Sequence, residues 1–147
     1  MLNRTSQRST SDSAGLVQLL FRMLAPVACL SFIGAVLTDW AYASSATIDY
    51  SNASAWLLLV GLVAAGMVIV LVALSFAGGW LRREYRWLGL GLFVLGFAVE
   101  IINFMVHNRD GWTTVVPTGL TLSVIGAVVM VAAAWIARAP LGSGSAS

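Results

Sequence analysis

Residues 88–107 read LGLGLFVLGFAVEIINFMVH, an apolar run with a single acidic side chain, Glu100, well inside it. About 20 such residues are enough to cross the hydrocarbon core of a bilayer as a helix. A carboxyl at that depth costs about 2–4 kcal/mol on insertion, so it is normally paired or functional. The run is the third of four in the chain, and this count predicts a polytopic membrane protein.

Four apolar runs meet the same length criterion. Pro26 and Pro117 both fall near the start of a run, where a missing backbone N–H costs least. Side-chain oxygens in residues 51–54 offer an N-cap before the second run. The sequence therefore predicts an all-α fold, a transmembrane four-helix bundle within residues 16–138, with spans at about residues 23–43, 56–80, 88–107 and 115–136.

The composition supports the same class. Of the 147 residues 59% are hydrophobic and 10% are charged, and the mean hydropathy is +0.90. Soluble domains carry about 25% charged residues, so the lipid bilayer is the expected partner of the outer surface. The eight basic residues are all arginine and form no patch interleaved with aromatics, so nucleic acid is not expected as a partner.

The polar ends of the chain are predicted to lie outside the bundle. Residues 1–15 are rich in Ser, Thr and Arg without apolar periodicity, which predicts a disordered tail. Residues 139–147 are rich in Pro, Gly and Ser, which predicts a second flexible tail.

The distribution of arginines predicts the orientation of the bundle. Basic residues are concentrated before the first span, between the second and third, and after the fourth: Arg4, Arg8, Arg22, Arg82, Arg83, Arg86 and Arg138. By the positive-inside rule both termini, and with them both tails, face the cytoplasm. All six tryptophans fall at or near span ends, where headgroups hold amphipathic rings: Trp40, Trp56, Trp80, Trp87, Trp112 and Trp135.

Polar side chains converge near the outer boundary of the predicted bundle. Glu100, Asn103 and His107 stand at i, i+3 and i+7, on one face of the third span. Residues from the other segments reach a similar depth, and the candidate site is a polar cluster that could hold a ligand or a proton: Asp39, Tyr42, Glu100, Asn103, His107, Arg109 and Thr118.

We expect Arg109 to fold back and pair with Asp39, and Glu100 to be held by Asn103 and a hydroxyl of the fourth span. The protonation state of Glu100 is left open. Glu100 is either a satisfied interhelical contact or a proton or ligand site. His107 is expected to be a solvated interfacial residue, because one histidine and one cysteine supply neither a metal set nor a nucleophile–base pair.

Small residues recur at four-residue spacing, as in Gly119, Ser123 and Ala127 of the fourth span. Such stripes let helix backbones approach closely in a membrane. The spacing fits packing within the bundle and also fits a seam between two copies of the chain.

Short segments from all four spans resemble one family: TDWAY (38–42), WLL (56–58) followed by Gly61 and Leu62, Asn103 with Arg109, VPTGL (116–120) and Trp135. With them, residues from about Met23 to Ile136 resemble the bacterial four-helix membrane proteins of domain of unknown function 2231. The resemblance implies a protein of the bacterial cytoplasmic membrane without an assigned activity.

Members of that family often carry a His-Pro pair early in span one, an acid after the glycine that ends span two, and a histidine early in span three. These places read Leu24-Ala25-Pro26, Gly78-Gly79-Trp80 and Leu88-Gly89-Leu90 in this chain. The resemblance therefore carries over only the outer polar residues, Asp39, Asn103 and Arg109.

Three functions fit the sequence. The first is a structural or accessory membrane protein without enzymatic activity, as a homo-oligomer or in a larger complex. The second is a binder of a small amphipathic ligand, a quinone or haem, in the outer half of the bundle; no cofactor is specified by the residues. The third is a proton-coupled transport subunit centred on Glu100, although the chain offers no inverted pair of broken helices.

Overall fold

The computed structural model describes residues 3–77, 87–109 and 115–138. It contains four long helices, α1 (Asn3–Ser45), α2 (Ile48–Ala77), α3 (Trp87–His107) and α4 (Leu120–Arg138), with a short helical segment, η1 (Val115–Gly119), before α4. Each long helix has a segment long and apolar enough to cross a membrane. The predicted all-α four-helix bundle is confirmed, and the chain is a multi-pass membrane protein.

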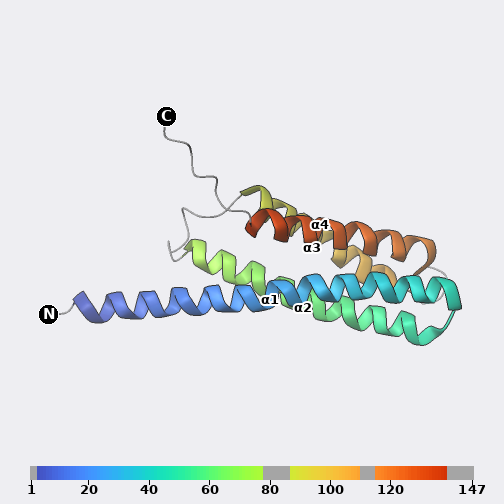
Figure 1. Ribbon diagram of the computed structural model, residues 1–147, viewed down its shortest axis with the longest axis horizontal. Coiled ribbons are helices and arrows are strands. Elements are labelled where there is room, and N and C mark those ends of the chain that lie inside the picture. The colour runs from blue at the N-terminus through green and yellow to red at the C-terminus, as the bar shows by residue number, and fades with distance from the viewer. Residues whose placement is uncertain (1–2, 78–86, 110–114, 139–147) are drawn as a thin grey trace.

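The helices pack as two antiparallel pairs, α1 with α2 and α3 with α4 (Figure 1). Helix α4 also lies against α1, and α3 against α2, which closes the bundle. We call the end where α1 turns into α2 the distal end and the opposite end, where α3 begins and α4 finishes, the proximal end. The first turns of α1 project beyond the bundle at the proximal end (Figure 1).

Helix α1 begins earlier than the sequence predicted. Residues 3–15, expected as a disordered tail, are helical and continue into the membrane-spanning segment. Once an apolar helix is nucleated, each added residue gains a backbone hydrogen bond, and this polar segment contains no proline to stop it. The predicted tail at residues 139–147 lies outside the described residues.

The connection between α1 and α2 is tighter than expected. Only Ala46 and Thr47 separate the two helices, and α2 begins at Ile48 instead of about residue 56. Ala46 takes a left-handed conformation (φ 51°) and donates its N–H to the carbonyl of Tyr42 at 2.8 Å, which ends α1. The polar residues 49–52 resembled a loop in sequence, but they form the first turns of α2.

Helices α3 and α4 match their predictions closely. Helix α3 spans Trp87–His107 against a prediction of 88–107. Pro117 lies just before α4, and Val116 is extended (φ −123°, ψ 124°), because the residue before a proline disfavours the helical region. The regular part of α4 therefore begins at Leu120.

The core is built from small and medium apolar residues, and the outer surface is apolar as well. Phe32, Leu58 and Met130 are fully buried at the centre. The four described tryptophans are between 67% and 78% exposed: Trp40 and Trp56 toward the distal end, Trp87 and Trp135 at the proximal end. A bundle with apolar surfaces inside and out, and with exposed tryptophans near both ends, is suited to lipid rather than water.

Candidate functional site

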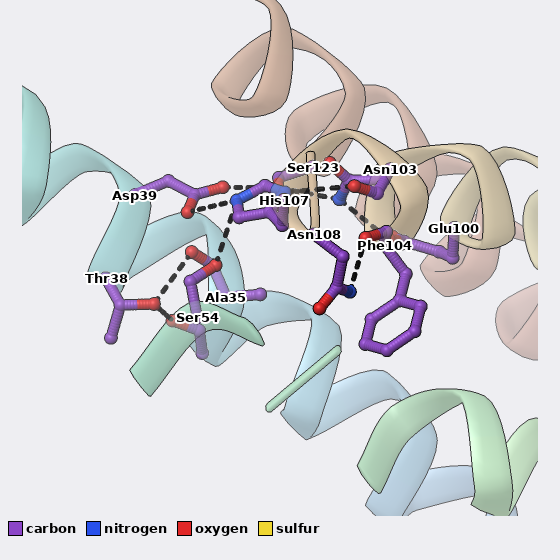
Figure 2. Close-up of polar contacts among 11 residues, drawn as sticks. Ala35, Thr38, Asp39, Ser54, Glu100, Asn103, Phe104, His107, Asn108 and Ser123 are labelled. Atoms are coloured by element: carbon purple, nitrogen blue, oxygen red, sulfur yellow. Dashed lines mark hydrogen bonds and ion pairs between the residues drawn. The ribbon is translucent and has the colours of Figure 1, made fainter. Parts of the chain in front are cut away.

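A hydrogen-bonded group of polar side chains lies inside the distal half of the bundle. Its members come from all four helices, and we call them the buried polar cluster: Asp39 of α1, Ser54 of α2, Glu100, Asn103 and His107 of α3, and Ser123 of α4. Figure 2 shows these side chains pointing toward one another between the helices. Five of them are 0% exposed, and His107 is 7% exposed.

The segment formed by η1 and α4 makes room for the polar face of α3 with small residues at matching positions. A Cβ atom built on Gly126 would lie 2.5 Å from Cδ of Glu100, and one built on Gly119 would lie 2.9 Å from Cε1 of His107. Between them, the hydroxyl of Ser123 accepts a hydrogen bond from Nδ2 of Asn103 at 2.8 Å. Both α3 and α4 therefore present residues spaced by three and four positions, and the two faces fit in one antiparallel register.

The carboxylate of Asp39 joins α1 to the other helices. Its Oδ2 accepts a hydrogen bond from the hydroxyl of Ser123 at 2.5 Å. Its Oδ1 lies 2.9 Å from Nε2 of His107. Both oxygens of this buried acid are thus engaged, as burial of a carboxylate requires.

His107 connects the largest number of elements. Nε2 lies 2.9 Å from Asp39 Oδ1 and 3.3 Å from the hydroxyl of Ser54, and Nδ1 lies 3.0 Å from the backbone carbonyl of Asn103. A carbonyl only accepts hydrogen bonds, so Nδ1 carries a hydrogen. One further proton lies between Nε2 and Asp39, so the pair is neutral in sum whichever atom holds it.

Glu100 is held less completely. Its Oε2 accepts a hydrogen bond from Nδ2 of Asn103 at 3.1 Å. Its Oε1 and Oδ1 of Asn103 are buried without a hydrogen-bond partner. An orphaned buried polar atom costs about 1–3 kcal/mol, so these two atoms need a physical explanation.

The residues one turn closer to the proximal end are apolar in every helix. They are Ala35 of α1, Leu58 of α2, Gly96 of α3 and Met130 of α4, each four positions from a residue at the level of the buried polar cluster, and all are buried. A Cβ built on Gly96 would meet Sδ of Met130 at 2.8 Å, so α3 and α4 are in close contact in this layer. The layer separates the buried polar cluster from the proximal half of the bundle.

The structure corrects three of the sequence predictions about the site. The Arg109–Asp39 ion pair is not formed, because Asp39 is bonded to His107 and Ser123 while Arg109 is exposed at the end of α3. Thr118, in η1, is also exposed and lies outside the cluster. His107 was expected to be solvated but is buried, because Gly119 lets its ring pack between the helices.

Other expectations hold. Asp39, Glu100, Asn103 and His107 share one region, and Asn103 does hold Glu100. The expected hydroxyl of the fourth span is that of Ser123, which reaches Asn103 and Asp39 rather than Glu100 itself. Tyr42 is buried one turn beyond Asp39 on α1, toward the distal end.

Sequence reasoning missed Ser54 and the roles of Ser123, Gly119 and Gly126. Ser54 was interpreted as part of a helix cap, but it lies inside α2 because that helix begins six residues earlier. Gly119 and Ser123 stood out only as a small-residue stripe. The sequence did contain one signal for these roles. Gly119, Ser123 and Gly126 are spaced by four and three positions, and the polar residues of α3 are spaced by three and four.

The geometry of the cluster fits interhelical hydrogen bonding better than a metal centre or a catalytic triad. Within residues 3–77, 87–109 and 115–138, no group of three or more His, Cys, Asp and Glu side chains is placed to hold a metal ion. Ser54 and Asp39 approach the same nitrogen of His107, whereas a nucleophilic serine and its orienting acid must use opposite nitrogens.

A groove of about 600 Å³ lies on the lipid-facing surface, and no residue of the buried polar cluster is among its described walls. Its described walls are apolar and come from α1 and α4: Ile33, Ala127, Val128, Val131, Ala132, Trp135 and Ile136. This surface offers a ligand no described polar side chain, apart from the indole of Trp135, to fix its orientation.

Comparison with known proteins adds no relative to this picture: no protein-family model, no curated protein and no solved structure matches this chain.

Proposed function

We propose that this chain is a structural or accessory protein of the bacterial cytoplasmic membrane, without enzymatic activity and with both termini in the cytoplasm. The observation that carries the proposal is the closure of the buried polar cluster, in which side chains of all four helices bond to one another at 0–7% exposure. Polar side chains that bond to neighbouring helices determine how the helices pack. The resemblance to domain of unknown function 2231 is part of the same proposal.

The outer surface supports an accessory role. Large apolar side chains such as Leu30, Val128 and Met105 are more than 60% exposed, so most of the helix surface is free to meet lipid or another membrane protein. In lipid, helix association depends on close packing and a few polar contacts. A rigid bundle with apolar faces meets the first of these conditions, close packing, for docking onto a larger complex or a second copy.

Native mass spectrometry of the protein, extracted from its membrane in mild detergent, tests this function. We expect a mass above that of one chain that is made up of protein alone. A single chain carrying a quinone or haem would support the ligand-binding alternative instead. A bare single chain would contradict the accessory role.

A second function, proton handling, is favoured by one specific observation. Glu100 lies fully buried with Oε1 unpartnered, beside the neutral Asp39–His107 pair. Ionisable groups inside a membrane span frequently belong to proton pathways. A Glu100→Gln variant separates the two functions: a contact role changes stability and leaves proton uptake unaltered, whereas a proton role loses uptake and retains the folded bundle.

A further inference from the structure

We propose that the buried polar cluster is a proton-binding site that exchanges with the distal side of the membrane alone, and that the exchanged proton resides on Oε1 of Glu100. The inference rests on the proposed function in one respect, that the bundle spans a bilayer with its distal end outside. It goes further by giving the cluster a ligand, a single proton, and one direction of access.

The position of the proton follows from counting hydrogens. Five contacts of the cluster, from Asn103 to Glu100 and Ser123, from Ser123 to Asp39, and from His107 to Asp39 and the Asn103 carbonyl, need one hydrogen each. The amide of Asn103 supplies two, the hydroxyl of Ser123 one and the doubly protonated ring of His107 two. These five contacts are then satisfied, and none of the five hydrogens is left over; the sixth contact, between Ser54 and Nε2 of His107, brings its own hydroxyl hydrogen and lies outside this count.

What remains is a pair of acceptor oxygens without a donor. Oε1 of Glu100 and Oδ1 of Asn103 are these two atoms. With Asp39 and Glu100 ionised and His107 charged, the cluster carries one net negative charge in a medium that opposes charge. One proton on Oε1 removes that charge and converts one orphaned acceptor into a donor.

The groups that face Glu100 from each element are consistent with an exchangeable proton. Asp39 is the charged group from α1, with Tyr42 one turn further toward the distal end, and His107 lies on α3 itself. Helix α2 contributes Ser54 and helix α4 contributes Ser123 and Gly126, none of which is charged. Arg109 and Asp49, the other described charges near the distal end, are exposed.

Access is possible at one end. His107, the cluster member closest to the distal end of α3, has a buried side chain and 7% exposure for the residue as a whole, and it is followed directly by exposed Asn108 and Arg109. Toward the proximal end the buried layer of Ala35, Leu58, Gly96 and Met130 closes the path with apolar atoms. A proton can therefore enter and leave at the distal end, and it is not conducted across the bundle.

Infrared spectroscopy of the protein in sealed vesicles tests the inference. The chain has two glutamates, Glu84 and Glu100, so a Glu84→Gln variant labelled with ¹³C-glutamate reports Glu100 alone. A labelling reagent that cannot cross membranes, applied to Ser45→Cys in a Cys29→Ala background, establishes which side of the vesicle the distal end faces. The pH is then changed on one side at a time.

We expect the carboxyl C=O band of labelled Glu100 to be replaced by the carboxylate bands when the pH is raised on the distal side, and to be unmoved by a change on the proximal side. A response to either side would overturn the one-sided access. A C=O band that responds to neither side would overturn proton exchange, and a carboxylate signal at every pH would overturn proton binding at Oε1. A second test compares the unlabelled wild-type protein with the single variant Glu100→Gln. We expect the responding C=O band to be absent from the variant, and a band that persists there would overturn the assignment to Glu100.

This experiment and the test of the accessory role fail separately. Mass spectrometry can find a bare single chain while the infrared band still responds on the distal side, in which case the proton site stands and the accessory role falls. A protein-only complex with an unresponsive band gives the reverse result.

Discussion

At the scale of single residues, His107 is the cluster side chain that contacts the largest number of other helical segments. It bonds to Asp39 of α1 and Ser54 of α2, belongs to α3, and packs against Gly119 of η1, directly before α4. Interhelical hydrogen bonds in membranes contribute on average about 0.6 kcal/mol each. Losing one partner of a buried ion pair costs about 3–5 kcal/mol, since the other charge is left uncompensated. Removing His107 therefore lowers the stability of the bundle mainly because it leaves the buried Asp39 carboxylate without its partner.

We predict that His107→Ala lowers the free energy of unfolding by about 3 kcal/mol, because it strands the Asp39 carboxylate in the core. Unfolding in mixed micelles, followed by helical circular dichroism, measures the change. Asn108→Ala is the matched control: its side chain is exposed and donates to the Phe104 carbonyl of α3 at 2.8 Å, so we expect less than about 0.5 kcal/mol. Equal effects of the two variants would contradict the role of the pair.

The double variant Asp39→Asn with His107→Gln tests the coupling of the two side chains. Replacing both members of a buried pair leaves no unpaired charge, so we expect it to be less destabilising than Asp39→Asn alone. The same unfolding assay gives the comparison. Additive losses would show that the two residues act independently.

At the scale of elements, the contact between α3 and α4 is decided by glycines. Gly119, Ser123 and Gly126 oppose His107, Asn103 and Glu100 in turn. A larger residue at either glycine position would have to displace a polar side chain that is packed against it. The register of the two helices is thus set by small residues on one and polar residues on the other.

We predict that Gly126→Ala destabilises the bundle by about 1–3 kcal/mol, because the new methyl group would overlap the Glu100 carboxyl. Gly91→Ala is the control. It lies in α3 with nothing within 4 Å of an added Cβ, so it should be neutral or stabilising by up to about 1 kcal/mol through helix propensity. Thermal unfolding in one detergent compares the two, and a neutral Gly126→Ala would show that the close packing of α3 on α4 is not required.

The helices themselves were predictable because each needs only one local property, a long apolar run. The start of α2 was not, since Asp49, Tyr50 and Asn52 are polar yet lie in a helix held by its neighbour α1. At the site, Glu100, Asn103 and His107 were predictable from spacing on one helix. Ser54 and Gly126 were missed because their roles depend on which helix faces which, and a single sequence contains no such contact information.

At the scale of the whole molecule, the protein has a polar cluster inside and an apolar surface outside. Polar groups at the centre bond to each other, and the outside carries apolar side chains over most of each helix. The positive-inside rule then decides which way the bundle is inserted. Most basic residues of the chain belong to the proximal end of the helices or to the segment between α2 and α3, so we expect the distal end to face outward.

Cysteine labelling in intact cells tests this orientation with little change to the protein. The chain has one cysteine, Cys29, which is only partly buried in α1, so Cys29→Ala gives a background without thiols. In that background Ser45→Cys, which is exposed at the distal end, should react with a maleimide that cannot cross membranes. Ser147→Cys should react only after the cells are opened, because positive charge holds the C-terminal segment in the cytoplasm. The reverse pattern would place the buried polar cluster in the inner half of the membrane, and any proton reaching Glu100 would then come from the cytoplasm.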